Sequence, residues 1–117
     1  MKTNKLLYVL GLWLALTGLA AAQSQSNSIE TFDVAQQGGK IIVRITTKEP
    51  LRTVPPNFAV ANPARIAFDF PNTVNGLGRS SQEIGEGELR SMNVVQGSDR
   101  TRVVLNLRRP VTHEATL

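Results

Sequence analysis

The sequence contains one pattern written twice, and this internal repeat constrains the fold more than any other feature. Residues 29–50 align without a gap on residues 89–110, sixty positions later. Identical residues recur in both copies at Val34 and Val94, Gln36 and Gln96, Val43 and Val103, and Pro50 and Pro110. Alternation alone makes any two amphipathic hairpins look similar, but prolines and glutamines paired at one fixed offset favour a true repeat. Two similar units in one small chain predict a pseudo-symmetric sheet structure.

Each copy reads as a strand, a polar turn, a second strand and a proline stop. Period-two alternation and β-branched residues predict strands over the ranges 29–35, 40–47, 58–61, 65–70, 80–84, 89–96 and 101–107. Gln37-Gly38-Gly39, Asn62-Pro63 and Gly97-Ser98-Asp99 are turn signals. No segment after residue 28 has helical periodicity. The pattern therefore predicts an all-β fold, either a small antiparallel β-sandwich or a barrel.

One face of these strands supplies enough apolar residues for a single core. The expected inward set is Phe32, Val34, Val43, Ile45, Ile66, Phe68, Phe70, Met92, Val94, Val103, Leu105 and Leu107. Each fully buried member would contribute roughly 1.5–3 kcal/mol relative to an exposed position.

The N-terminal segment has the pattern of a helical signal peptide and is excluded from the predicted fold. Lys2 and Lys5 precede an apolar run over residues 6–19, and the alanines at 20–22 supply a cleavage signature between Ala22 and Gln23. An uncleaved anchor is the alternative, but the run is shorter than the roughly 20 residues of a membrane span. We therefore expect a signal peptide over 1–22, a flexible leader over 23–28, and the domain over 29–117.

Cysteine and charge narrow the class of protein further. The chain has no cysteine, which excludes a lipid-anchored lipoprotein and leaves the domain without disulfides. The net charge of +4 falls to +2 without Lys2 and Lys5, which is a weak argument for any polyanion partner. We expect an exported, periplasmic protein that binds no nucleic acid.

The second copy of the repeat is shorter than the first. After Pro50 the first copy continues through two further strands to Phe70, whereas only residues 111–117 follow Pro110. We therefore expect a C-terminally truncated sandwich that lacks its last strand. An open sheet edge predicts marginal stability and association through that edge.

Catalytic and metal-binding patterns are weak in this chain. His113 is the single histidine, and no cysteine or carboxylate spacing joins it. Glu83, Glu86 and Glu88 fall in a glycine-rich segment that reads as a solvated loop. We predict no catalytic residue, no metal site, no cofactor and no enzymatic activity.

Four basic residues are the candidate ligand-binding residues. Arg44, Lys48, Arg102 and Arg108 are expected to point outward from the two long strands. A basic sheet face suits the carboxylates of peptidoglycan or of an acidic protein. The alternative is that these charges only confer solubility and protect strand edges.

Several segments resemble a known family. They are Asn-Pro-Ala-Arg-Ile-Ala-Phe-Asp-Phe-Pro-Asn at 62–72, Leu-Gly-Arg-Ser at 77–80, Leu-Arg-Ser-Met-Asn-Val at 89–94, and Asp-Arg-Thr-Arg-Val-Val-Leu-Asn-Leu at 99–107. These segments resemble an AMIN domain, and more closely the N-terminal AMIN domain of the outer-membrane secretins of type IV pili. The resemblance implies a β-sandwich of two similar halves, in agreement with the repeat.

The resemblance also implies a function. AMIN domains act as periplasmic targeting modules with peptidoglycan as the usual proposed ligand, so we expect a non-catalytic docking module of a secretin in pilus assembly and protein secretion. The parent protein would form a homo-oligomeric outer-membrane ring and contact other type IV pilus proteins. Two alternatives stay open: the targeting domain of a periplasmic N-acetylmuramoyl-L-alanine amidase, or a purely structural docking domain. No binding motif is sharp enough to assign ligand residues from the family.

Overall fold

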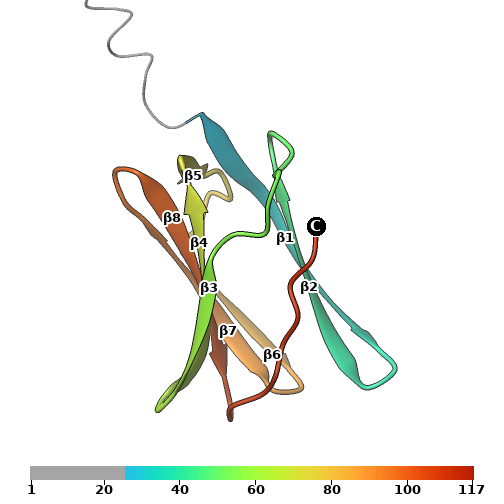
Figure 1. Ribbon diagram of the computed structural model, residues 1–117. Coiled ribbons are helices and arrows are strands. Elements are labelled where there is room, and N and C mark those ends of the chain that lie inside the picture. The colour runs from blue at the N-terminus through green and yellow to red at the C-terminus, as the bar shows by residue number, and fades with distance from the viewer. Residues whose placement is uncertain (1–25) are drawn as a thin grey trace, which may run out of the picture.

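Two β-sheets packed face to face make up the described part of the protein, residues 26–117 of a computed structural model (Figure 1). The strands are β1 (Asn27–Gln37), β2 (Lys40–Thr47), β3 (Asn57–Ala61), β4 (Ala64–Pro71), β5 (Thr73–Asn75), β6 (Ser81–Glu86), β7 (Leu89–Gln96) and β8 (Arg100–Leu107). Sheet A has the order β2-β1-β5, and sheet B has the order β3-β4-β8-β7-β6. The expected all-β sandwich is confirmed.

The two repeat copies form one hairpin in each sheet. In sheet A, β1 and β2 pair antiparallel, with Val34 opposite Val43. In sheet B, β7 and β8 pair antiparallel, with Val94 opposite Val103. The turn between β1 and β2 requires positive φ at Gly38 and Gly39, which glycine adopts without a Cβ clash.

Strand β4 joins the two halves of the chain. It pairs antiparallel with β8, so a strand that follows the first hairpin in sequence extends the sheet of the second hairpin. The chain then enters β5, which pairs parallel with the start of β1 through Asn27 and Thr73. Buried Thr101 of β8 donates from Oγ1 to the Thr73 carbonyl at 2.5 Å, which links sheet B to sheet A.

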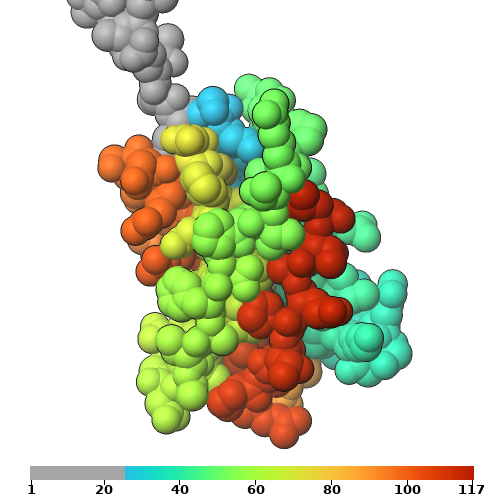
Figure 2. Space-filling model, viewed as in Figure 1, coloured from blue at the N-terminus to red at the C-terminus, as the bar shows by residue number. Residues whose placement is uncertain are grey.

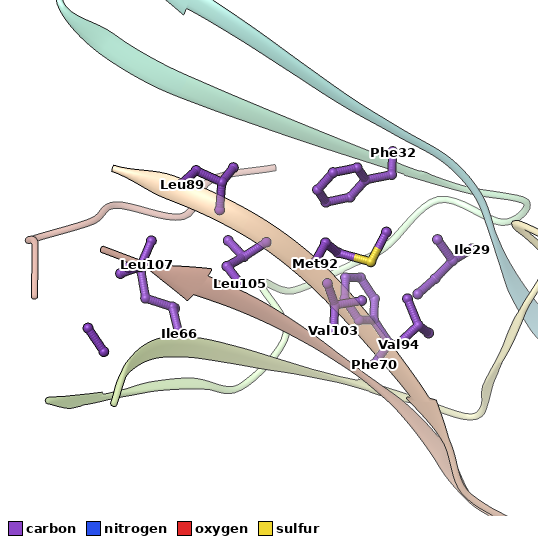
Figure 3. Packing of buried hydrophobic residues seen from close by; sticks show 11 residues of the cluster. Ile29, Phe32, Ile66, Phe70, Leu89, Met92, Val94, Val103, Leu105 and Leu107 are labelled. Atoms are coloured by element: carbon purple, nitrogen blue, oxygen red, sulfur yellow. The ribbon is translucent and has the colours of Figure 1, made fainter. Parts of the chain in front are cut away.

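The core lies between the sheets. Its buried apolar residues are Ile29, Phe32, Ala64, Ile66, Phe70, Leu89, Met92, Val94, Val103, Leu105 and Leu107. Figure 3 shows Ile29 and Phe32 of β1 facing a layer from sheet B that includes Met92 and Val103. Sheet B supplies most of this core, because it has five strands whereas sheet A has three.

The structure corrects the expected core at four positions. Val34, Val43, Ile45 and Phe68 point inward as expected, but all four are only partly buried. Three of them belong to the β1–β2 hairpin, which lies at one margin of the sandwich.

The structure also corrects two expectations about strands. β1 begins at Asn27, inside the segment expected to be a flexible leader over 23–28, because Asn27 and Ser28 pair with β5. Strand β5 itself was absent from the expected set, and its pairing with β1 is parallel in an otherwise antiparallel fold. The predicted signal peptide over 1–22 lies outside the described residues. Within residues 26–117, no helix is long and apolar enough to cross a membrane.

Candidate binding surface

The outer side of sheet B combines exposed apolar side chains with fixed polar ones. Cross-strand partners share one side of a sheet, so the register defines this surface. Phe58 is opposite Ala67, which is opposite Val104; Asp69 is opposite Arg102, which is opposite Val95. We call this the outer face of sheet B, and it comprises Phe58, Val60, Arg65, Ala67, Asp69, Ser91, Asn93, Val95, Arg102, Val104 and Asn106.

Three large apolar side chains on this face are open to solvent. Phe58 and Val60 are 47% and 40% exposed on edge strand β3, and Val95 on β7 is 59% exposed. The β3 pair and Val95 lie on opposite sides of the strip formed by β4 and β8. Exposed apolar residues grouped on one side of a sheet mark a binding surface more often than isolated ones do.

An ion pair at the centre of the face holds the Phe58 ring. Arg102 donates from Nε to Asp69 Oδ1 at 2.7 Å and from Nη2 to Asp69 Oδ2 at 3.0 Å. The Arg102 guanidinium carbon lies 5.1 Å from the centroid of the Phe58 ring, within cation–π range. A two-pronged pair fixes the plane of the guanidinium and thereby the surface on which the ring rests.

The ion pair shifts the pKa values of both groups in the direction that favours their charged forms. The hydrogen bonds from Arg102 lower the pKa of the Asp69 carboxyl below its usual value near 3.8, against an opposing effect of burial. The hydrogen bond to Asp69 raises the pKa of Arg102 above its usual value. Asp69 is therefore ionised at neutral pH, and the charge of Arg102 is largely matched within the protein.

A row of polar side chains lies beside the apolar ones. Asn106 Nδ2 donates to Ser91 Oγ at 3.0 Å and to Asn93 Oδ1 at 2.7 Å. Asn106 and Ser91 lie opposite each other, and Asn106 continues to Arg65 of β4. These amide and hydroxyl groups lie two to three strands from the Phe58 ring on the same face, so they can hydrogen-bond an extended polar ligand whose apolar side lies on the ring.

The four basic candidates from the sequence do not form one surface. Arg44 lies on the outer side of sheet A opposite Asp33, whereas Arg102 lies on the outer face of sheet B. Lys48 and Arg108 follow the ends of β2 and β8, and Arg108 Nε donates to the Gly87 carbonyl at 3.0 Å. Arg44, Lys48 and Arg108 are exposed, while Arg102 is partly buried in its pair with Asp69.

Sequence reasoning missed Phe58, Val60, Val95 and Asp69 as members of one site. The alternation placed Asp69 on the outward side of its strand, but its partner on β8 depends on the β4–β8 register. Phe58 falls in a short strand where inward and outward positions cannot be separated without a partner strand. One signal was present in the sequence: Val95 lies two residues after the polar Asn93, so both share one side of the strand. An apolar residue on a polar side indicates an exposed apolar position.

The remaining sequence candidates have structural partners. His113 Nε2 lies 2.9 Å from Asn57 Oδ1, and its ring packs edge-on against Phe68 with centroids 5.9 Å apart. Glu88 pairs with Arg109, whose Nε lies 2.9 Å from Glu88 Oε2. Among residues 26–117, no three side chains of His, Cys, Asp or Glu gather where they could hold a metal ion.

Comparisons with known proteins define the class to which this two-sheet domain belongs. Residues 29–116 match the family model described as "AMIN domain". Because the match covers most of the sequence, the chain belongs to the AMIN domain family.

Several curated relatives carry one protein name. The chain is 35% identical over 93 residues to the "Fimbrial assembly protein PilQ" of Pseudomonas aeruginosa, which is 79% of this chain and 13% of that protein. It is 38% identical over 56 residues to the "Type IV pilus biogenesis and competence protein PilQ" of Neisseria gonorrhoeae, which is 48% of this chain and 8% of that protein. The Neisseria meningitidis protein of the same name matches to the same extent over 7% of its length. No solved structure matches the chain.

Proposed function

We propose that this chain is a non-catalytic docking module of a type IV pilus secretin. Its membership of the AMIN family and its similarity to fimbrial assembly and pilus biogenesis proteins named PilQ support this assignment. The chain spans 13% or less of the length of these relatives, so pore formation and ring assembly belong to the parent protein in this proposal. In this scheme the domain lies in the periplasm, and the parent protein is an oligomeric outer-membrane ring that contacts other pilus proteins.

We propose peptidoglycan as the ligand and the outer face of sheet B as its site. The observation that carries this is Phe58, which is half exposed and has over its ring the guanidinium of Arg102, itself fixed by Asp69. One sugar of a glycan strand can stack its C–H side on Phe58, while the hydroxyl groups of another sugar bond to amides such as Asn93 and Asn106, two to three strands away on the same face. A pre-positioned ring also costs less conformational entropy on binding than a mobile one.

The basic residues have a separate role in this proposal. Arg44, Lys48 and Arg108 add positive charge around the domain, and this charge attracts the carboxylates of the wall peptides. Arg102 acts differently, because its guanidinium already bonds Asp69 and supports Phe58. The electrostatic part of binding is expected to fall with salt, whereas stacking on Phe58 is expected to persist.

Co-sedimentation with purified sacculi tests the ligand and the surface together. We expect the wild-type chain to sediment with sacculi, and Phe58→Ala to lower the bound fraction at both low and high salt. The matched control is Val54→Ala, which removes an exposed apolar side chain outside the outer face of sheet B. Arg44→Ala is expected to weaken sedimentation at low salt only.

A chain that stays in solution with sacculi at low salt would refute wall binding and favour docking onto other pilus proteins. The amidase alternative differs in the parent protein. A gene whose disruption leaves piliation intact but blocks separation of daughter cells would favour the amidase reading.

We further propose that the protein is exported and cleaved between Ala22 and Gln23. The charged start, the apolar run and the alanines of residues 1–22 support this boundary. The folded domain then begins at Asn27, after a short leader. N-terminal sequencing of the protein recovered from the periplasm is expected to begin at Gln23. An N-terminus at Met1 would contradict cleavage.

A further inference from the structure

The outer face of sheet B is ordered in rows that run across its strands. In one row, Phe58 is opposite Ala67, Ala67 is opposite Val104, and Val104 is opposite Asn93. This row continues onto edge strand β6, because Ser81 lies opposite Asn93. We call Phe58, Ala67, Val104, Asn93 and Ser81 the central row. It crosses the five strands of sheet B, so at about 4.8 Å between neighbouring strands it spans roughly 19 Å.

The middle of the central row is less exposed than its ends. Ala67 is buried and Val104 is partly buried. Phe58 is 47% exposed at one end, and Asn93 and Ser81 are exposed at the other. The row therefore presents an aromatic ring, two small apolar side chains and then polar groups. An extended ligand that lies across the strands contacts all three parts, whereas a compact ligand contacts only one of them.

The C-terminal residues pack on the other side of sheet B and leave the central row open. His113 packs edge-on against Phe68, whose side chain points inward. Figure 2 shows residues 110–117, in red, between the green strands of sheet B and the teal β1–β2 hairpin. These residues therefore do not compete with a ligand for the central row.

Arg65 carries an unmatched positive charge beside the central row. It lies opposite Asn106, is exposed, and is two residues from Ala67 on the same side of β4. Among residues 26–117, no acidic side chain forms an ion pair with Arg65, whereas Arg102 on the other side of the row is paired with Asp69. A guanidinium without a partner can bind a carboxylate of a ligand through two parallel hydrogen bonds.

We propose that the central row binds a glycan strand of the wall in its peptide-free form, and that Arg65 binds the free carboxylate of one of its sugars. This inference rests on the proposed function, because it names the form of peptidoglycan that the same face selects. In peptidoglycan, every second sugar carries a lactyl group whose carboxyl is joined to the stem peptide as an amide. Hydrolysis of that amide releases the peptide amine and leaves a carboxylate close to the sugar ring. An amidase reaction therefore supplies this ligand.

The alternation of the two sugars fits the spacing of the strands. A β-1,4-linked sugar advances by about one strand spacing, so one sugar lies over each strand. An N-acetylglucosamine over Phe58 places a carboxylate-bearing N-acetylmuramic acid over β4, beside Arg65. The next carboxylate falls over β7, where Asn93 is exposed. The sugar over β6 is again the neutral one, which is favourable because Glu83 lies there opposite Ser91 and would repel a carboxylate.

Charge at the lactyl group distinguishes the two forms of the glycan. The free carboxylate accepts charge-assisted hydrogen bonds from Arg65, whereas the amide of a peptide-bearing sugar presents a neutral carbonyl. The carboxylates of a stem peptide lie on a flexible chain, so their contact with Arg65 loses more conformational entropy. The peptide-free form is therefore expected to bind at least about tenfold more tightly.

Titration with soluble glycans tests the proposal on the full chain. Two probes are the same four-sugar wall fragment, one peptide-free and the other with its stem peptides. The third is a neutral chitin fragment of four sugars, which measures stacking without the carboxylate. Shifts of the side-chain amide signals of Asn93 and Asn106 in NMR spectra give the dissociation constants. We expect the peptide-free probe to bind at least about tenfold more tightly than either of the others.

A matched pair of variants locates the charged contact. Arg65→Gln removes the charge beside the central row and is expected to weaken binding of the peptide-free probe about tenfold, so that the two wall probes bind alike. Arg52→Gln removes an exposed charge from the loop between β2 and β3 and is expected to keep the preference. Both replaced side chains are exposed, and the backbone amide spectrum verifies that each variant is folded.

The outcomes separate this inference from the proposed function. Equal affinities of the two wall probes, or a preference that survives Arg65→Gln, would overturn selection of the peptide-free form and leave wall binding intact. A chain that sediments with sacculi but binds neither soluble wall fragment would also overturn it, because the site would then require intact cross-linked wall. If neither fragment binds and the chain stays in solution with sacculi, the inference and the proposed function both fail.

Discussion

Asp69 and Arg102 form an ion pair that gives the outer face of sheet B a fixed arrangement of side chains. The two groups lie on neighbouring strands, and their two hydrogen bonds fix the guanidinium over the Phe58 ring. Exposed ion pairs contribute little to stability on their own. Here the Asp69 side chain is only 16% exposed, so its charge state bears on both the fold and the position of the ring.

Replacement of Asp69 by asparagine is expected to remove a pH-dependent part of the stability. The pKa of Asp69 is lowered in the folded protein, so its stabilising effect is complete above the unfolded-state value near 3.9 and is lost as pH falls below it. In urea denaturation, the free energies of unfolding of the wild type and Asp69→Asn should differ by a constant amount from about pH 7 to 5. The difference should then shrink as pH falls below about 4.

The matched control is Glu83→Gln, which neutralises an exposed carboxylate on edge strand β6. Its unfolding midpoint should follow the wild type across the same range. Equal pH profiles for Asp69→Asn and the wild type would show that the ion pair makes no contribution to stability.

The repeat supplies a matched pair of core substitutions. Val103→Ala removes two methyl groups from a site that is 1% exposed and is expected to cost about 2–3 kcal/mol of unfolding free energy. Val43→Ala removes the same groups from the equivalent, partly exposed site and should cost about 1 kcal/mol or less. Urea denaturation measures both. Equal costs would contradict the difference in cover between β8 and β2.

At the scale of elements, the hairpins were predictable and their neighbours were not. Alternation and turn residues define β1, β2, β7 and β8, because a hairpin is specified by residues close in sequence. Strand β5 has three residues and no pattern of its own, and it exists because β1 offers it a parallel partner. The pairing of β4 with β8 joins residues 29 to 41 positions apart, from Pro71 with Arg100 to Arg65 with Asn106, so no local signal contains it.

Gly76 closes the junction between β5 and β1. Its N–H donates to the Ile29 carbonyl at 2.9 Å, and an added Cβ would lie 2.7 Å from that oxygen. Gly76→Ala is therefore expected to push β5 away from β1 and destabilise the domain by about 1–3 kcal/mol. Thermal unfolding measures the loss.

Gly97→Ala is the control for this junction, because its added Cβ would meet its nearest neighbour, the Arg100 carbonyl, at 3.4 Å. The control should stay within about 0.5 kcal/mol of the wild type. Similar midpoints for both glycine variants would show that the β1–β5 junction tolerates a side chain.

For the whole molecule, one core serves both sheets. Sheet A contributes Ile29 and Phe32, which pack against residues of sheet B (Figure 3). Sheet A is mainly the β1–β2 hairpin, because β5 adds only three residues, and an isolated hairpin has little stability in water, so sheet A depends on this contact. The candidate surface also exists only at this scale, because it combines β3, β4, β7 and β8 through registers that sequence patterns do not determine.

Phe32→Ala is expected to destabilise both sheets together. Loss of this buried ring should lower the free energy of unfolding by about 3–5 kcal/mol. The urea midpoint of amide protection should fall equally in β1 and in β8. Thr31→Ala changes the exposed neighbour and serves as the control. A midpoint that falls in β1 but not in β8 would show that the sheets unfold independently.

The pairing of β4 with β8 has a consequence for where the domain can be divided. Each hairpin carries the same register and the same bulge, yet the strand after the first hairpin extends the sheet of the second. A cut between β4 and β5 would therefore take from β8 its partner on one side, so the two copies of the repeat are not separable folding units.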